Sequence, residues 1–197
     1  MKFRASLAIA VVSLFACNAA FAHSGTGLAG GFASGFRHPI AGVDHLLAMV
    51  AVGLWGGILG RPLIYVLPVV FPLVMVIGAA IGMFGFPLPA PEIGVALSAI
   101  VLGACVASTL RAPVWSASLL VGAFAIFHGY AHGVELPSAA DPIGYSAGFV
   151  FATGLLHLAG IAIGALAHWR GGAIVARGAG AIVALAGAGY LHQALTS

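Results

Sequence analysis

Histidines and acidic residues lie in two short segments of an otherwise apolar chain. Imidazole nitrogen is a ligand for nickel, copper, zinc and cobalt, and carboxylate oxygen also binds divalent cations. The spacings within each segment, seven residues in the first and four and three in the second, place side chains on one face of a helix. The pattern predicts a divalent-metal site. Its candidate ligands are His38, Asp44 and His45 in the first segment and His128, His132 and Glu135 in the second.

The composition predicts that these residues lie in a membrane. The chain has 197 residues, of which 62% are hydrophobic and 6% charged, and its mean hydropathy is +1.16. Soluble domains of this size do not have such a composition. The formal charge of +3 comes from singly scattered basic residues, which excludes a nucleic-acid partner because phosphate binding needs a basic face. The lipid bilayer is therefore the expected environment.

The N-terminus is typical of an export signal. Lys2 and Arg4 precede an apolar run over residues 5–16, and a small-x-small cleavage site ends at Ala22. Residues 1–22 are thus expected to be a signal peptide, although lipoprotein processing at Cys17 and an uncleaved first helix are alternatives. Cleavage makes His23 the first mature residue, whose amine and imidazole form a candidate nitrogen chelate for nickel or copper.

The remaining residues 23–197 hold six apolar stretches of about 20 residues, the length that a helix needs to span a bilayer. Prolines, glycines or arginines separate them. The expected fold is therefore all-α, a polytopic membrane helix bundle forming one six-helix permease domain. The predicted spans are residues 39–60, 62–84, 92–110, 114–133, 143–167 and 173–192.

The charges between the spans predict the orientation, because basic residues are retained on the cytoplasmic side. An exported N-terminus places Arg61, Arg111, Arg170 and Arg177 at cytoplasmic ends, with Arg37 as the exception. The acidic loop residues then lie outside. Both termini are expected in the periplasm, and both histidine segments are expected near the periplasmic face.

Ionisable groups inside a bilayer point to function because burying one costs about 3 kcal/mol or more. A divalent cation would neutralise Asp44, or Asp44 would orient an imidazole. His157 lies about 20 Å along the fifth span at 1.5 Å per residue, which makes it a candidate second metal station. Structural hydrogen bonding is the alternative for these residues, and a solvated loop charge is the alternative for Glu135. His168 and His192 are expected at helix ends.

Two motifs resemble those of a known family. Residues 38–45 match HPxxGxDH, and residues 127–135 match FHGxAHGxE. The chain therefore resembles the HupE/UreJ family of hydrogenase and urease accessory proteins, which are regarded as nickel permeases of the bacterial inner membrane. The resemblance implies uptake of Ni²⁺, or Co²⁺, as substrate with no prosthetic group, and an indirect link to hydrogenase or urease maturation. It carries the metal-binding role onto the six residues of the two segments.

Two other classes of function remain open from the residues. Intramembrane zinc hydrolases also hold a metal with histidine and aspartate, but the chain has no H-E-x-x-H motif, and we expect no serine beside the histidines. A metal-binding accessory protein that does not transport is the third class. For a transporter, a membrane potential supplies roughly 4.6 kcal/mol per divalent ion at 100 mV, so no ATPase is required.

Overall fold

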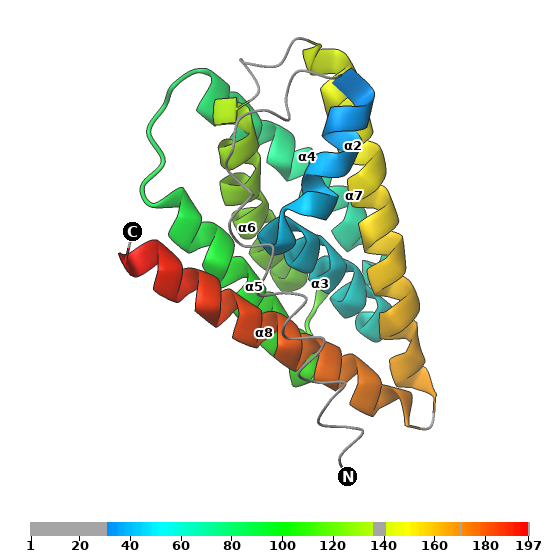
Figure 1. Cartoon of the computed structure of the whole chain (residues 1–197). Helices are drawn as coiled ribbons and strands as arrows, with labels where there is room; N and C mark the ends of the chain where they lie inside the picture. Colours follow the sequence, from blue (N-terminus) through cyan, green and yellow to red (C-terminus); the bar gives the residue numbers. More distant parts are fainter. Residues whose placement is uncertain (1–30, 136–140, 170, 197) are drawn as a thin grey trace, which may run out of the picture.

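The computed structural model describes residues 31–135, 141–169 and 171–196, and the regular elements in these ranges are all helices (Figure 1). The predicted all-α membrane bundle is confirmed. The predicted signal peptide, His23 and Arg170 lie outside the described residues. The elements are α2 (Gly31–Ala41), α3 (Val43–Leu59), α4 (Leu63–Met83), α5 (Pro91–Ala107), α6 (Val114–Glu135), α7 (Pro142–Ala165), the 3-10 turn η2 (Leu166–His168) and α8 (Gly172–Thr196).

Each of the six predicted stretches corresponds to a helix, but not every helix is long enough by itself to span a bilayer. Four helices, α4, α6, α7 and α8, are long and apolar enough to cross it. The pair α2 and α3 passes the same test only when taken together, and it is bent by 79°. Helix α5 has 17 residues, about 25 Å at 1.5 Å per residue, which is the lower limit for a span.

The first predicted span needs a correction at its start. We expected Pro39 to begin the helix and the two histidines of this segment to share one helical face. Instead Pro39 lies inside α2, and the helix breaks at Gly42, whose backbone is extended (φ −77°, ψ 100°). His38 therefore ends one helix, and His45 begins the next. Their seven-residue spacing does not describe a common face, because the bend separates the two helices.

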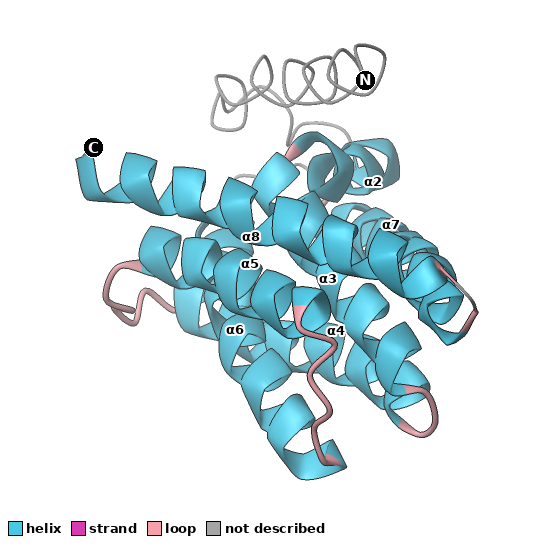
Figure 2. Cartoon of the chain, turned by 90° about the horizontal axis from the view of Figure 1, so that it is seen from below, coloured by secondary structure: helices cyan, strands magenta, loops and turns pink. Residues whose placement is uncertain are grey.

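Glycines allow several pairs of helices to pack with their backbones in close contact. A Cβ atom on Gly53 of α3 would collide with the carbonyl of His157 in α7, and one on Gly129 of α6 would collide with the carbonyl of Met75 in α4. Gly103 of α5 packs in the same way against α8, and these two helices run side by side in Figures 1 and 2. Small residues are how apolar helices associate in lipid, where the hydrophobic drive is absent.

The helices alternate in direction and so sort the charged residues between two ends of the bundle. We call the end where α3 and α7 begin and α6 ends the histidine end, and the opposite end the arginine end. The acidic residues Asp44, Glu92, Glu135 and Asp141 belong to the histidine end by their positions in the helices, whereas Arg61, Arg111 and Arg177 belong to the arginine end. The predicted separation of charge, with Arg37 on α2 as the expected exception, is therefore present in the described fold.

Candidate metal centre

Three helices bring four imidazole rings together at the histidine end. Ring centroids lie 4.8 Å apart for His38 and His132, 4.5 Å for His45 and His132, and 5.0 Å for His45 and His128. His38 comes from α2, His45 from α3 and the other two from α6. We call these four residues together with Asp44 the histidine cluster. The two segments that the sequence singled out thus form one site.

Asp44 orients the imidazole of His45. Both residues lie in the first turn of α3, and the carboxylate Oδ1 is 3.0 Å from Nδ1 of the ring. A neutral imidazole that donates from Nδ1 carries its lone pair on Nε2. A carboxylate behind a histidine is a common arrangement at metal sites, because it sets the ring orientation and raises its basicity. Asp44 therefore favours the tautomer in which Nε2 of His45 carries the lone pair.

Ser98 has the same relation to His128, and the sequence did not identify it. This serine is fully buried on α5, and its Oγ lies 2.6 Å from the Val95 carbonyl and 2.8 Å from Nε2 of His128. Because its single hydroxyl hydrogen is donated to the carbonyl, the ring must donate from Nε2 to Oγ. The lone pair of His128 is then on Nδ1, which is buried and has no hydrogen-bond partner among the described residues.

The expectation that no serine lies beside the histidines was therefore wrong. Ser98 precedes His128 by 30 residues, and only the packing of α5 against α6 brings the two together. The sequence offered one indication of this contact, the single hydroxyl residue in the apolar segment 93–107. Such a hydroxyl most often hydrogen-bonds to a backbone carbonyl of its own helix. Ser98 makes that intrahelical bond as well as the contact with His128.

His132 lies at the centre of the cluster with neither ring nitrogen hydrogen-bonded to any described residue. The side chain is 7% exposed, and its ring contacts His38, His45 and Phe149, the last at 4.4 Å between centroids. An unsatisfied buried polar group costs about 1–3 kcal/mol. Such a cost is expected where a ligand supplies the missing partner. Glu135 ends α6 three residues later, and its side chain lies outside the described part of the structure.

The rings contact one another without enclosing a ready coordination site. His45 and His128 meet at an interplanar angle of 88°, and His38 and His132 at 75°. Within residues 31–135, 141–169 and 171–196, no three histidine, cysteine or acidic side chains are arranged to hold a metal ion as they stand. The imidazoles must therefore rotate before several of their nitrogens bind one ion.

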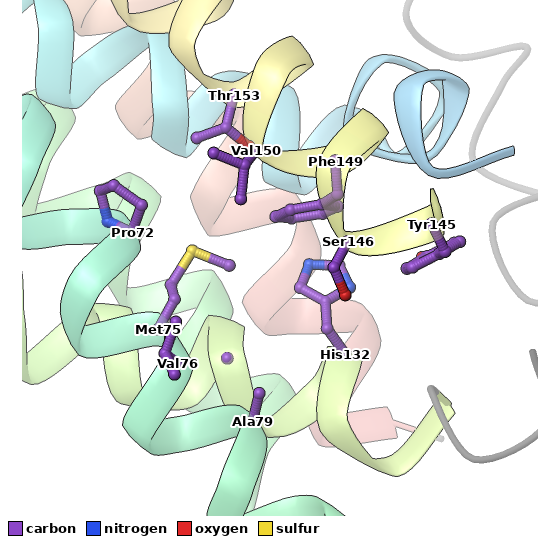
Figure 3. A pocket seen from close by; sticks show the side chains of 11 residues that line it. Pro72, Met75, Val76, Ala79, His132, Tyr145, Ser146, Phe149, Val150 and Thr153 are labelled. Carbon is purple, nitrogen blue, oxygen red and sulfur yellow. The ribbon is translucent and has the colours of Figure 1, made fainter. Parts of the chain in front are cut away.

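A cavity of about 100 Å³ leads away from His132 between α4, α6 and α7. His132 and Tyr145 lie towards one end of it and Pro72 towards the other (Figure 3). The volume accommodates a few water molecules. Most of its lining is apolar, and the polar contributions come from His132, Tyr145, Ser146 and Thr153.

His157 lies deeper in the bundle than the cluster, as predicted, but it is closer to the cluster than its position along α7 suggested. Its side chain is 1% exposed. The ring of Phe71 on α4 contacts both His128 of the cluster and His157, at centroid distances of 5.5 Å and 5.6 Å. His157 and the histidine cluster therefore share one aromatic neighbour.

The remaining described histidines lie at helix ends, as expected. His168 belongs to the turn after α7, and its Nε2 is 3.0 Å from the carbonyl of Gly57. His192 is exposed near the end of α8. Neither contributes to the cluster.

Comparison with known proteins agrees with the two motifs. Residues 9–190 match the family model of the HupE / UreJ protein. Protein HupE of Rhizobium leguminosarum bv. viciae is 44% identical over 171 residues, which cover 86% of this chain and 90% of that protein. No solved structure matches the chain. The match over nearly the whole sequence shows that this multi-pass membrane protein belongs to the HupE/UreJ family.

Proposed function

We propose that the chain is a nickel permease of the bacterial inner membrane, with Co²⁺ as a second substrate. It takes up the divalent ion from the periplasm into the cytoplasm for the maturation of hydrogenase or urease. The termini lie in the periplasm, so the histidine end faces outward. Membership of the HupE/UreJ family supports this role, and the segregation of arginines to the other end of the bundle supports the orientation.

The observation that carries the proposal is the pair of oriented imidazoles. Asp44 places a lone pair on His45 Nε2, and Ser98 places one on His128 Nδ1. The rings of these two histidines are 5.0 Å apart. A carboxylate or hydroxyl that fixes the tautomer of an imidazole is the arrangement found behind histidines that bind metal.

In this mechanism a hydrated cation reaches the histidine end and exchanges water for imidazole nitrogen. His45, His128 and His132 supply nitrogens, His38 rotates in from the end of α2, and Asp44 provides negative charge next to the ion. Glu135 attracts the ion at the end of α6. Nitrogen-rich sites bind nickel more tightly than cobalt, and copper more tightly than either, so the geometry of the site must supply the selectivity for nickel over copper. The inward-negative membrane potential drives a divalent ion toward the cytoplasm.

The hydrolase alternative finds less support. An intramembrane zinc hydrolase needs its substrate beside a metal-bound water. Ser98 and His128 are both fully buried, so a lipid or amide substrate has no direct access to them.

Uptake of radiolabelled nickel at nanomolar metal tests the proposal. Cells expressing Asp44→Asn or His128→Ala should accumulate at least about tenfold less nickel than wild type, because loss of even an orienting partner costs about 10–100-fold in metal affinity. His192→Ala is the matched control, since this exposed histidine lies outside the cluster. Unlabelled cobalt, zinc and copper added as competitors measure selectivity.

Three outcomes separate the classes of function. Equal accumulation by Asp44→Asn and wild type at equal expression would rule out transport through this site. Nickel binding by purified wild-type protein without accumulation in vesicles would indicate an accessory protein. Turnover of a lipid or amide by the purified protein, lost in His128→Ala, would indicate a zinc hydrolase.

A further inference from the structure

The side chain of His157 is buried inside the bundle and hydrogen-bonds to a backbone carbonyl of another helix. Its imidazole hydrogen-bonds with the carbonyl of Pro68 in α4. An imidazole that donates from one nitrogen keeps the lone pair on the other. Nε2 of His157 is buried and has no hydrogen-bond partner in the described part of the chain.

The Pro68 carbonyl has no intrahelical hydrogen-bond donor, because the residue that would supply one is also a proline. In a helix the carbonyl of residue 68 accepts from the amide of residue 72. Residue 72 is Pro72, which has no amide hydrogen. The proline pair in α4 therefore supplies an acceptor inside the bundle, and His157 from α7 uses it. This pairing gives the two prolines a role in orienting a histidine.

The cavity that starts at His132 extends toward His157 as far as Thr153 and Pro72. Thr153, one helical turn before His157 on the same face of α7, lines the cavity that starts at His132. Pro72 lines it as well and adjoins Phe71, the ring that contacts both His128 and His157. An ion that leaves the cluster inward thus meets Phe71 and then the His157 imidazole.

We propose that His157 is a second metal-binding station, which takes the divalent cation from the histidine cluster after the Phe71 ring moves aside. This inference rests on the proposed transport function. One imidazole completed by water binds a divalent ion more weakly than several imidazoles do. A weak inner station suits transport, because conduction requires that an ion bind well enough to enter and loosely enough to leave.

The test compares binding with transport in the purified full chain. Equilibrium nickel binding is measured in detergent, and initial nickel uptake is measured in proteoliposomes with an imposed membrane potential. His157→Gln keeps an amide donor for the Pro68 carbonyl but removes the metal-binding nitrogen. We expect its uptake to fall at least about tenfold, while the dissociation constant of the tight site changes less than about twofold, because the orienting partners of the cluster are intact.

Two further variants complete the comparison. His192→Gln, at an exposed histidine, should leave both measurements unchanged. Pro72→Ala restores an amide that competes with His157 for the Pro68 carbonyl. We expect about tenfold slower uptake from Pro72→Ala, as for the loss of a residue that orients a metal ligand, together with unchanged nickel binding and thermal stability at least equal to wild type.

Each outcome bears on the inner station. Wild-type uptake by His157→Gln, with loss of uptake in Asp44→Asn, would overturn it and leave the proposed function standing. A parallel loss of affinity and uptake in His157→Gln would make His157 a member of the cluster, which also overturns a separate station. If His157→Gln does not fold, unchanged uptake by a folded Pro72→Ala protein counts against the proposal, and slower uptake supports it. Absence of uptake by wild type would remove the proposed function and the inner station with it.

Discussion

The two ends of the bundle use similar polar side chains in opposite ways. At the arginine end, Trp55 Nε1 donates to the Leu110 carbonyl at 3.0 Å, Arg177 Nε donates to the Ala107 carbonyl at 2.9 Å, and His168 contacts the Gly57 carbonyl. At the histidine end the partners are other side chains. Asp44 pairs with His45, and Ser98 pairs with His128.

The difference shows how structural and functional histidines are told apart. The last carbonyls of a helix lack intrahelical donors, so a side chain that donates to one of them is engaged in closing that helix. A carboxylate or a hydroxyl behind an imidazole instead sets the tautomer and directs the other nitrogen elsewhere. A second ring nitrogen that is buried without a hydrogen-bond partner among the described residues, as in His128 and His157 but not in the exposed His168, is therefore the feature that we take to indicate a metal-binding role. Substitutions at the two ends, and in the helices between them, test this distinction.

The largest effect should come from the close packing that holds the two ends in place. Gly129→Ala puts a Cβ atom into the backbone carbonyl of Met75. Overpacking costs about 1–3 kcal/mol, and more where rigid backbone must move. We expect little folded protein and no nickel uptake. On the same helix, Gly122→Ala meets only side-chain atoms of Val74 and Val70, at 3.6 and 3.8 Å, and should fold as wild type in size-exclusion chromatography.

The second-largest effect is expected from a comparison of two alanine substitutions, one at a histidine from each end of the bundle. Losing a residue that orients a metal ligand costs about 10–100-fold in affinity, so His132→Ala, which removes a proposed ligand, should reduce nickel uptake about a hundredfold. His168→Ala loses one hydrogen bond to a carbonyl and should cost about 0.5–1.5 kcal/mol of stability, with normal uptake per folded molecule. Uptake and thermal unfolding are measured on both. Equal uptake by the two variants would contradict this assignment of roles.

Ser98→Ala tests the orientation of His128. The ring loses the acceptor at Nε2 and with it the reason to keep its lone pair on Nδ1. We expect about tenfold weaker nickel binding, seen as a higher half-saturating nickel concentration with a similar maximal rate. A lower maximal rate with unchanged half-saturation would instead indicate that Ser98 acts in a later step.

The smallest effect is expected at Trp55. Trp55→Phe keeps most of the buried ring and removes the bond to the Leu110 carbonyl, a loss of about 0.5–1.5 kcal/mol. Thermal unfolding should shift to slightly lower temperature while nickel affinity and uptake remain at wild-type values. A change in nickel affinity would show that the arginine end acts on the metal site.

Much of the fold was predictable because it depends on local properties. The length of each apolar stretch and the prolines and glycines between them identified the helices, with α5 and the bent first pair as the least regular cases. The break at Gly42 was missed, since glycine permits both helical and extended backbone and the sequence around it does not decide between them.

The amino-acid sequence by itself determined which residue types occur at which helix ends, and so identified all the histidines of the cluster and the separation of charge. Only the tertiary structure decided which helix lies beside which, and at what rotation. Ser98 behind His128, Phe71 before His157 and the Pro68 carbonyl beside that histidine all depend on this packing. The physical reason is that spacing along one helix sets its faces, whereas contacts between helices depend on where glycines let the backbones meet.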